Sequence, residues 1–552
     1  MFSPRHLHTH RTGSAWGVRH SWLLIVTLAI APAPRVMSTP ASEAIAHASV
    51  GEAITNAYAT ELMRRPKTSE VQHWESVIAA SEMTAQGLSE AFRGSEEAVK
   101  LRRKRRGQAW ELCKSVGALI VFLGMAYVVT VRRCPERKVV FILFALLVTP
   151  VFMDYDLVYE KAHFLDLPSF YYGADYVYNQ HRSPYGNILQ DELGGKIFPF
   201  FHPPPCLIAF YPLSLMSLDV AKEVVTFGSQ VALLLVLYFL IIRGRAGENV
   251  VIPLGLTVYM LSFYPNWLTF VYGQPNFWTT LFICVFMEAY VRKRSGAWVG
   301  LPLAAAIIMK IYPGLLLGYL LLKRKWSAIA WCFAALGVAT VIGLVTVPWE
   351  IWESWWACVG SRSSYGAVGP VGLFSPAGPW NQGLNGICLR LLTVNSFTFG
   401  ITDDPKLSKL VTYLLSASVL FGATFLLWLR NRRDCREDEE LEMGLLLVVM
   451  TVVVPLSWLH HSVMLLPAIA AGARHAFKHR RPLIVALFLV SAMLLAWDLS
   501  ALPVQLRLLK GGMSLLLGSA AGFARLGLVI SIGAMLIEPW RTPPASKPAS
   551  AS

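Results

Sequence analysis

Charged residues are scarce in this chain, and their scarcity is the first constraint on its fold class. Only 15% of the 552 residues are charged, whereas 55% are hydrophobic. The hydrophobic residues come in runs of about 15–24 between short charged clusters, a pattern typical of many membrane-spanning helices. The runs lack the alternation of period two that a transmembrane β-barrel requires. The sequence therefore predicts an all-α polytopic membrane protein.

Metal and disulfide patterns are also missing. The eight cysteines are scattered, mostly inside hydrophobic runs, without a CxxC pair or a His/Cys ligand spacing. This pattern predicts neither a disulfide framework nor a zinc site, and we expect no cofactor. The net charge of +15 comes from basic residues at the ends of the hydrophobic runs. It therefore indicates membrane topology and contact with lipid headgroups, and no binding of nucleic acid.

The composition divides the chain into four parts. Residues 1–38 contain a short hydrophobic stretch followed by small residues, which predicts a signal peptide or an N-terminal anchor. Residues 39–109 are polar and predict a helical or disordered segment. Residues 110–540 predict the transmembrane domain, and residues 541–552 a disordered tail.

We expect about 13 membrane segments in this domain. They lie near residues 110–131, 138–153, 222–242, 250–264, 276–291, 298–309, 313–322, 327–347, 407–429, 441–457, 462–473, 482–498 and 513–537. Several are short, as expected for helices that are broken where they line a cavity. The proline-rich stretch Pro203–Met216 predicts a re-entrant or interfacial segment.

Basic connections set the expected orientation in the plasma (inner) membrane. They all fall on the cytoplasmic side, except Arg102–Arg106 before the first segment. Polar residues then gather in the extracytoplasmic connections, and ionisable groups at membrane depth usually mark a site. Because five such clusters share one face, they favour a single site over separate helix caps and interfacial anchors. These residues are Asp166, Tyr171, Tyr172, Tyr185, His202, Gln274, Asn276, Lys310, Asn381, Gln382, Arg390, His460 and His461.

Ordered motifs between about Val140 and Arg474 carry a family resemblance. They are "DLPSFYYGADYVYNQHRSPYG", "FPFFHPPPCLIAFYPLSLM", "GQPN", "KIYP", "NQGLNG" and "PLSWLHH". The chain resembles glycosyltransferase family 87, although its residues before Trp110 fall outside the resemblance. The resemblance implies a GT-C-like membrane enzyme with an extracytoplasmic active-site loop. Such an enzyme transfers a hexose, here expected to be mannose, from a polyprenyl-phosphate donor to a glycan or glycolipid acceptor.

This chemistry needs a base for the acceptor hydroxyl, and Asp166 is the first candidate. Its alternative role is a helix N-cap, because an Asp-x-Pro sequence often begins a helix. Asp154 and Asp156 are close competitors as the base, and Asp175 is a weaker one. The "DYD" sequence also matches the metal motif of nucleotide-sugar enzymes, but no nucleotide-binding domain accompanies it.

The leaving phosphate needs positive charge or hydrogen-bond donors. Lys310 fits this role unless it extends to the interface, and Arg390 and His461 are further candidates. The adjacent His460 and His461 form a poor metal ligand set, so we expect no metal. Tyr172, Tyr185 and His202 complete the candidate substrate site. Four amides are expected to bind sugar hydroxyls or to cap helices: Gln274, Asn276, Asn381 and Gln382.

Two other functions fit a membrane protein of this composition. A transporter or flippase for a lipid-linked sugar would carry inverted repeats and paired broken helices, and the sequence shows no such repeat. A non-catalytic protein of cell-envelope assembly would keep the fold without the activity.

Overall fold

The computed structural model describes residues 54–55, 58, 66–81, 164–186, 188–193, 200–243, 251–362, 364–366, 375–433, 438–479, 481–497, 499 and 512–537. The chain divides into two compact units, Met1–Ile120 and Val121–Ser552. The first unit contains helix α3 (Thr68–Ser81). The expected segments 110–131 and 138–153, together with Asp154 and Asp156, lie outside the described residues.

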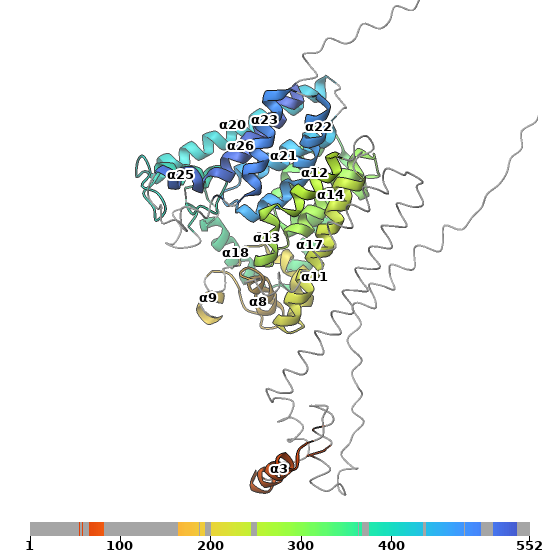
Figure 1. The fold of residues 1–552 in the computed structure, drawn as a ribbon, viewed down its shortest axis with the longest axis vertical. Coiled ribbons are helices and arrows are strands. Elements are labelled where there is room, and N and C mark those ends of the chain that lie inside the picture. Colours follow the sequence, from red (N-terminus) through yellow and green to blue (C-terminus); the bar gives the residue numbers. More distant parts are fainter. Residues whose placement is uncertain are drawn as a thin grey trace, which may run out of the picture. The chain divides into compact units, whose positions relative to one another are not determined.

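The second unit is built from helices, and its described part contains no strand. Its elements, most of them labelled in Figure 1, are α8 (Leu167–Tyr178), α9 (Ile188–Leu193), α10 (Pro204–Ser214), α11 (Leu218–Leu237), η3 (Tyr238–Arg243), α12 (Val251–Leu261), α13 (Tyr264–Tyr272), α14 (Asn276–Val291), α15 (Gly296–Met309), η4 (Tyr312–Gly314), α16 (Leu315–Leu322), α17 (Trp326–Thr346), α18 (Trp349–Arg362), α19 (Leu384–Leu392), α20 (Pro405–Arg432), α21 (Glu439–Val453), η5 (Leu459–Leu465), α22 (Leu466–His479), α23 (Pro482–Ala496), α25 (Gly512–Gly518) and α26 (Ala520–Ile537).

Four of the described helices are long and apolar enough to cross a membrane. They are Leu218–Ile241, Trp326–Thr346, Pro405–Arg432 and Ala520–Ile537. Four shorter apolar helices accompany them: Asn276–Val291, Gly296–Met309, Tyr312–Leu322 and Pro482–Ala496. The predicted all-helical membrane class is confirmed, whereas the total of about 13 segments stays a prediction.

Several expected membrane segments are interrupted, and the interruptions occur at polar residues and prolines. Helix α15 ends before Lys310, whose backbone is extended with φ −149° and ψ 130°. The segment expected over 441–457 stops being helical at Val453, two residues before Pro455. The proline-rich stretch forms helix α10, because prolines at the first helical positions lose no backbone hydrogen bond.

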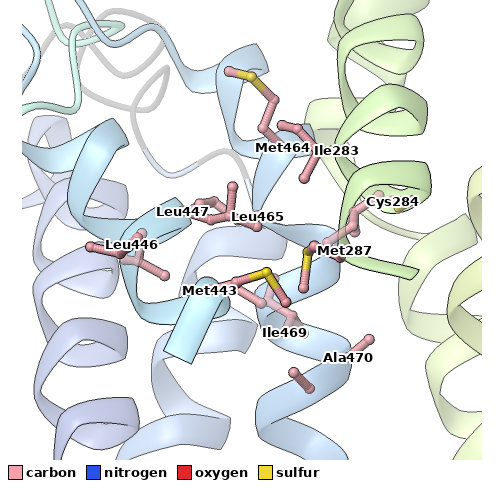
Figure 2. Packing of buried hydrophobic residues seen from close by; sticks show 14 of the residues in the cluster. Ile283, Cys284, Met287, Met443, Leu446, Leu447, Met464, Leu465, Ile469 and Ala470 are labelled. Carbon is pink, nitrogen blue, oxygen red and sulfur yellow. The ribbon is translucent and has the colours of Figure 1, made fainter. Parts of the chain in front are cut away.

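The main hydrophobic core lies where α14, α21, α22 and η5 meet. Figure 2 shows side chains of these elements converging: Ile283, Cys284, Met287, Met443, Leu446, Leu447, Met464, Leu465, Ile469 and Ala470. Helices α21 and α22 approach closely at Gly444, where an added Cβ would lie 3.1 Å from the Cα of Ala468. In a membrane, this close packing of small residues supplies much of the attraction between helices. The core therefore fixes the start of η5.

A second cluster holds the first described loop of this unit. Aromatic rings of α8, α10 and the residues before α10 stack together, with Phe170 and Phe210 4.5 Å apart between ring centroids. Helix α10 also packs on α17 and α18. The beginning of α8 lies beside the end of α13, where the Asp166 N–H donates to the Tyr272 carbonyl.

A buried ion cluster lies at the start of α21. The Glu442 carboxylate accepts hydrogen bonds from Arg430 Nε at 2.8 Å and from the Tyr319 hydroxyl at 2.9 Å. Lys323 Nζ lies 2.8 Å from the same carboxylate. The cluster joins α16, α20 and α21 at the end of α21 that lies away from η5.

Candidate active site

Asp166 immediately precedes α8 and occupies its N-cap position. Its backbone N–H donates to the carbonyl of Tyr272 at 3.0 Å, and Phe164 N–H donates to Val271 O at 2.8 Å. Its side chain turns away from the α8 backbone and accepts a 2.7 Å hydrogen bond from Gln274 Nε2. The N-cap alternative therefore does not describe the Asp166 side chain.

Gly273 makes this close approach of two segments feasible. It ends α13 with a left-handed backbone, φ 68°, which glycine adopts without steric cost. An added Cβ would lie only 2.7 Å from the Cβ of Leu167, the neighbour of Asp166. The glycine of the "GQPN" motif thus lets Gln274 reach the carboxylate.

Lys310 contributes the cation of the site. It is 4% exposed, so it does not extend to an aqueous interface. Its Nζ donates to Gln274 Oε1 at 3.3 Å and lies 2.9 Å from His461 Nε2. A continuous chain of contacts therefore runs from Asp166 through Gln274 and Lys310 to His461.

The two histidines lie side by side at the start of η5. Their ring centroids are 4.6 Å apart and their planes are nearly perpendicular. His460 stands edge-on to Tyr272, and His461 lies against Tyr312, each at 5.4 Å. Asn276 Nδ2 donates to the carbonyl of His460 at 3.1 Å, which ties α14 to η5.

These side chains face one cavity of about 330 Å³. Its polar and aromatic lining residues are Asp166, Ser169, Phe170, Phe200, Phe201, His202, Tyr272, Gln274, Lys310, Tyr312, Trp380, Trp458, His460 and His461. The carboxylate, the cation and the three histidines come from segments that lie far apart in the sequence. The described residues contain no group of three His, Cys, Asp or Glu side chains suited to a metal ion.

Burial and neighbouring charges shift the pKa values of Asp166, Lys310 and His461. Removal from bulk water raises the pKa of Asp166 to about 6, although the Gln274 hydrogen bond and the Lys310 charge oppose the rise. Burial lowers the pKa of Lys310 to about 8, against the attraction of Asp166. Burial and the Lys310 charge hold the pKa of His461 well below its usual range. The site therefore combines a carboxylate, an ammonium and a neutral imidazole between pH 6 and 8.

Five of the predicted substrate and base residues line the cavity, and each contacts the next through its side chain. They are Asp166, Gln274, Lys310, His461 and His460. His202 also lines it, with its ring against Phe170 and Phe200. Tyr185 supports it from outside, because its hydroxyl donates to the His202 carbonyl at 2.8 Å. Tyr172 packs edge-on against Tyr171 instead of lining the cavity.

Three further predicted residues have partners inside the protein. Asn381 Nδ2 donates to the Pro455 carbonyl at 3.0 Å, and its Oδ1 accepts from Ser457 N–H at 3.0 Å. Gln382 bonds Gly518 and Gly522 in the α25–α26 region. Arg390 donates to the carbonyls of residues 377, 378 and 381. None of the three lines the cavity described above. The Asn381 side chain ties the long loop to the segment after α21, Gln382 ties it to the α25–α26 region, and Arg390 binds carbonyls of the loop itself.

Several cavity residues were not predicted. Four aromatic side chains line the cavity: Tyr272, Tyr312, Trp380 and Trp458. Tyrosine and tryptophan beside hydrophobic runs usually indicate a membrane interface, so the sequence did not mark them as site residues. Tyr312 and Trp458 lie within the motifs "KIYP" and "PLSWLHH", and Tyr272 and Trp380 directly precede "GQPN" and "NQGLNG", which was the available signal. Arg525 of α26 contacts the segment that carries the histidines, and its position far along the chain gave no signal.

A helical membrane unit with a carboxylate and a cation in one buried cavity is suited to group transfer from a lipid donor. Comparison with known proteins supports this class. Residues 200–457 match the model of glycosyltransferase family 87, which confirms the predicted resemblance. The chain is a membrane glycosyltransferase.

The relatives are mycobacterial mannosyltransferases. A polyprenol-phosphate-mannose-dependent alpha-(1-2)-phosphatidylinositol mannoside mannosyltransferase of Mycobacterium tuberculosis is 25% identical over 327 residues, covering 56% of this chain and 70% of the relative. A phosphatidylinositol pentamannoside mannosyltransferase of Mycolicibacterium smegmatis, also polyprenol-phosphate-mannose-dependent, is 28% identical over 319 residues, covering 56% and 70%. No solved structure shows a significant match.

Proposed function

We propose that the protein transfers mannose from a polyprenyl-phosphate donor to a glycolipid or glycan on the extracytoplasmic face of the plasma membrane. The observation that carries this proposal is the bridge through Gln274, which joins a carboxylate to an ammonium in one cavity. Transfer needs these two groups close together, because a proton leaves the acceptor while negative charge develops on the phosphate.

Asp166 acts as the base in this proposal. Its carboxylate takes the proton of the acceptor hydroxyl, and the hydroxyl oxygen attacks the anomeric carbon of mannose. The bond between that carbon and the phosphate oxygen breaks, and its electron pair leaves with the polyprenyl phosphate. A pKa of about 6 suits the task, since the carboxylate is then ionised near neutral pH and still basic.

Lys310 stabilises the leaving phosphate. An ammonium group has three N–H donors, and two of them are directed to Gln274 and His461. The third is available for a phosphate oxygen. Because His461 Nε2 faces the Lys310 ammonium, the imidazole proton lies on Nδ1, which has no hydrogen-bond partner among the described residues. His461 is therefore a second donor for the substrate.

The rest of the cavity suits a sugar on a lipid. A volume of about 330 Å³ lies within the range of small-ligand pockets. Aromatic faces of Trp380, Trp458 and Tyr272 offer stacking surfaces for the hexose, and the polyprenyl chain would enter from the bilayer. The names of the relatives support mannose as the sugar and a phosphatidylinositol mannoside as the acceptor.

The proposal is tested by transfer in proteoliposomes. Purified protein is incubated with polyprenyl-phosphate mannose labelled in the sugar and with a phosphatidylinositol mannoside acceptor. We expect label in the acceptor lipid, and little label when the donor carries glucose. Movement of labelled donor across the bilayer without any transfer would contradict the proposal and favour a flippase.

A further inference from the structure

Arg525 is a fully buried cation that the proposed chemistry does not use. It lies in α26, is 0% exposed, and follows the family match, which ends at residue 457. Its Nη1 donates to Ser457 Oγ at 2.7 Å, and also reaches the carbonyls of Thr451 at 3.2 Å and Ser457 at 3.4 Å. Its Nη2 donates to Trp458 O at 3.1 Å and to Ser462 Oγ at 2.8 Å.

All these acceptors belong to one short stretch, from the end of α21 to the first turn of η5. The stretch has lost the α-helical hydrogen bonds that would otherwise satisfy its carbonyls, since α21 ends at Val453 and η5 begins at Leu459. The planar fork of a guanidinium can bind acceptors on both sides of such a turn, whereas an ammonium is a compact point charge. Arg525 therefore replaces the missing helix contacts.

The same turn carries the two histidines of the cavity. His460 and His461 lie between Trp458 and Ser462, which are both Arg525 partners. The position of His461 Nε2, 2.9 Å from Lys310 Nζ, consequently depends on how that turn is held. Asn381 Oδ1 also accepts from Ser457 N–H at 3.0 Å, so residues of two other segments hold the turn.

We infer that Arg525 is a positioning residue for the transfer reaction: its guanidinium fork holds the Ser457–Ser462 turn so that His461 meets Lys310 at the phosphate side of the cavity. Arg525 does not itself line the cavity. The inference rests on the proposed function for its link to transfer. Its geometric content, the dependence of the Lys310–His461 contact on Arg525, stands apart from the identity of the substrate.

The kinetic test compares two identical substitutions at equally buried arginines. Arg525→Lys keeps the charge and loses the fork, and Arg430→Lys makes the same change in the ion cluster with Glu442. We expect Arg525→Lys to lower kcat roughly 10- to 100-fold per folded molecule, with the KM of the acceptor within about twofold, because small misplacements of reacting groups have such effects. The alkaline limb of its pH profile also moves, since Lys310 loses its fixed partner.

The control and a milder variant make the result decisive. Arg430→Lys is expected to lower the unfolding temperature and leave kcat and the pH profile at the wild-type values. Ser462→Ala removes a single Arg525 contact and should lower kcat about fivefold, less than the loss expected for Arg525→Lys. A wild-type kcat and pH profile in Arg525→Lys, or an equal loss in Arg430→Lys, would overturn the inference.

A second readout works without transfer. Nitrogen NMR of protein labelled in its histidine rings reports which ring nitrogen of His461 carries the proton. In the wild type we expect one His461 tautomer, with Nε2 unprotonated. In Arg525→Lys and Ser462→Ala we expect a signal averaged over the two neutral tautomers of the ring. If the wild type transfers no mannose, the proposed function fails, while this measurement still decides the role of Arg525. Identical signals in all three proteins would overturn that role.

Discussion

The amide of Gln274 joins Asp166 to Lys310. Its nitrogen donates to Asp166 Oδ2 over 2.7 Å, and its oxygen accepts from Lys310 Nζ over 3.3 Å. An amide can satisfy both neighbours at once, because it carries a donor and an acceptor on one planar group. The spacing between the carboxylate and the ammonium is thus set by one side chain, which is itself only 7% exposed.

Replacing this amide should uncouple the two groups. We expect Gln274→Met, which keeps the length and loses both hydrogen bonds, to lower kcat/KM for the donor roughly 10- to 100-fold. Gln230→Met, at a buried glutamine of α11 that does not line the cavity, is the matched control. Equal kcat/KM values for both variants in the transfer assay would count against the bridge.

The pH dependence of transfer follows from the two shifted groups. Asp166 accepts a proton only when ionised, so activity is lost as the pH falls through its pKa of about 6. Lys310 must keep its proton, so activity is also lost as the pH rises through about 8. A profile of kcat/KM against pH should be bell-shaped between these limits.

Removing the cation should move the acidic limb of that profile. The Lys310 charge lowers the pKa of Asp166, so in Lys310→Met the limb shifts to higher pH while the rate falls. Lys406→Met, at an exposed position near the start of α20, should retain the wild-type profile. An acidic limb at the same pH in wild type and Lys310→Met would show that another group titrates.

Gly273 should tolerate no side chain. Gly273→Ala combines a left-handed backbone with a Cβ at 2.7 Å from Leu167, and we expect about 1–3 kcal/mol of lost stability. Transfer should fall as well, because the strain displaces Asp166 from Gln274. Gly318→Ala in α16 meets nothing within 4 Å and should be neutral or slightly stabilising in thermal unfolding.

The Glu442 cluster should affect stability without affecting catalysis. Glu442→Gln removes the charge that pairs with the buried Arg430 and the partly buried Lys323, and we expect a loss of about 3–5 kcal/mol. Glu192→Gln, in an exposed pair with Arg182, should leave the unfolding temperature unchanged. Thermal unfolding in detergent separates the two, and kcat per folded molecule should equal the wild-type value in both.

The sequence predicted the fold class and several residues that line the candidate cavity, because both depend on local patterns. Hydrophobic runs directly indicate membrane helices, and polar residues beside them, such as Lys310 and His461, stand out against that background. The helices end at other residues than predicted where a proline or a polar residue interrupts a hydrophobic run, as after Val453 and at Lys310.

Long-range partners were beyond prediction from a single sequence. Asn381, Gln382 and Arg390 share the polar character of Gln274, yet their hydrogen bonds hold backbone carbonyls of neighbouring segments. Only the arrangement of the helices decides whether such a polar side chain lines the cavity or binds the backbone of a neighbouring segment. Arg525 was missed for the same reason, since one arginine in an apolar helix does not reveal which turn it binds.

The role of Asp166 as the base is the central claim, and one pair of variants tests it most directly. Asp166→Asn is compared with Asp175→Asn, a change within α8 at a carboxylate that bonds only Asn179 and Gln180 among the described side chains. Initial rates are measured with labelled polyprenyl-phosphate mannose. We expect a loss of about 100- to 10,000-fold for Asp166→Asn and less than about twofold for Asp175→Asn. Wild-type transfer by folded Asp166→Asn would contradict the account.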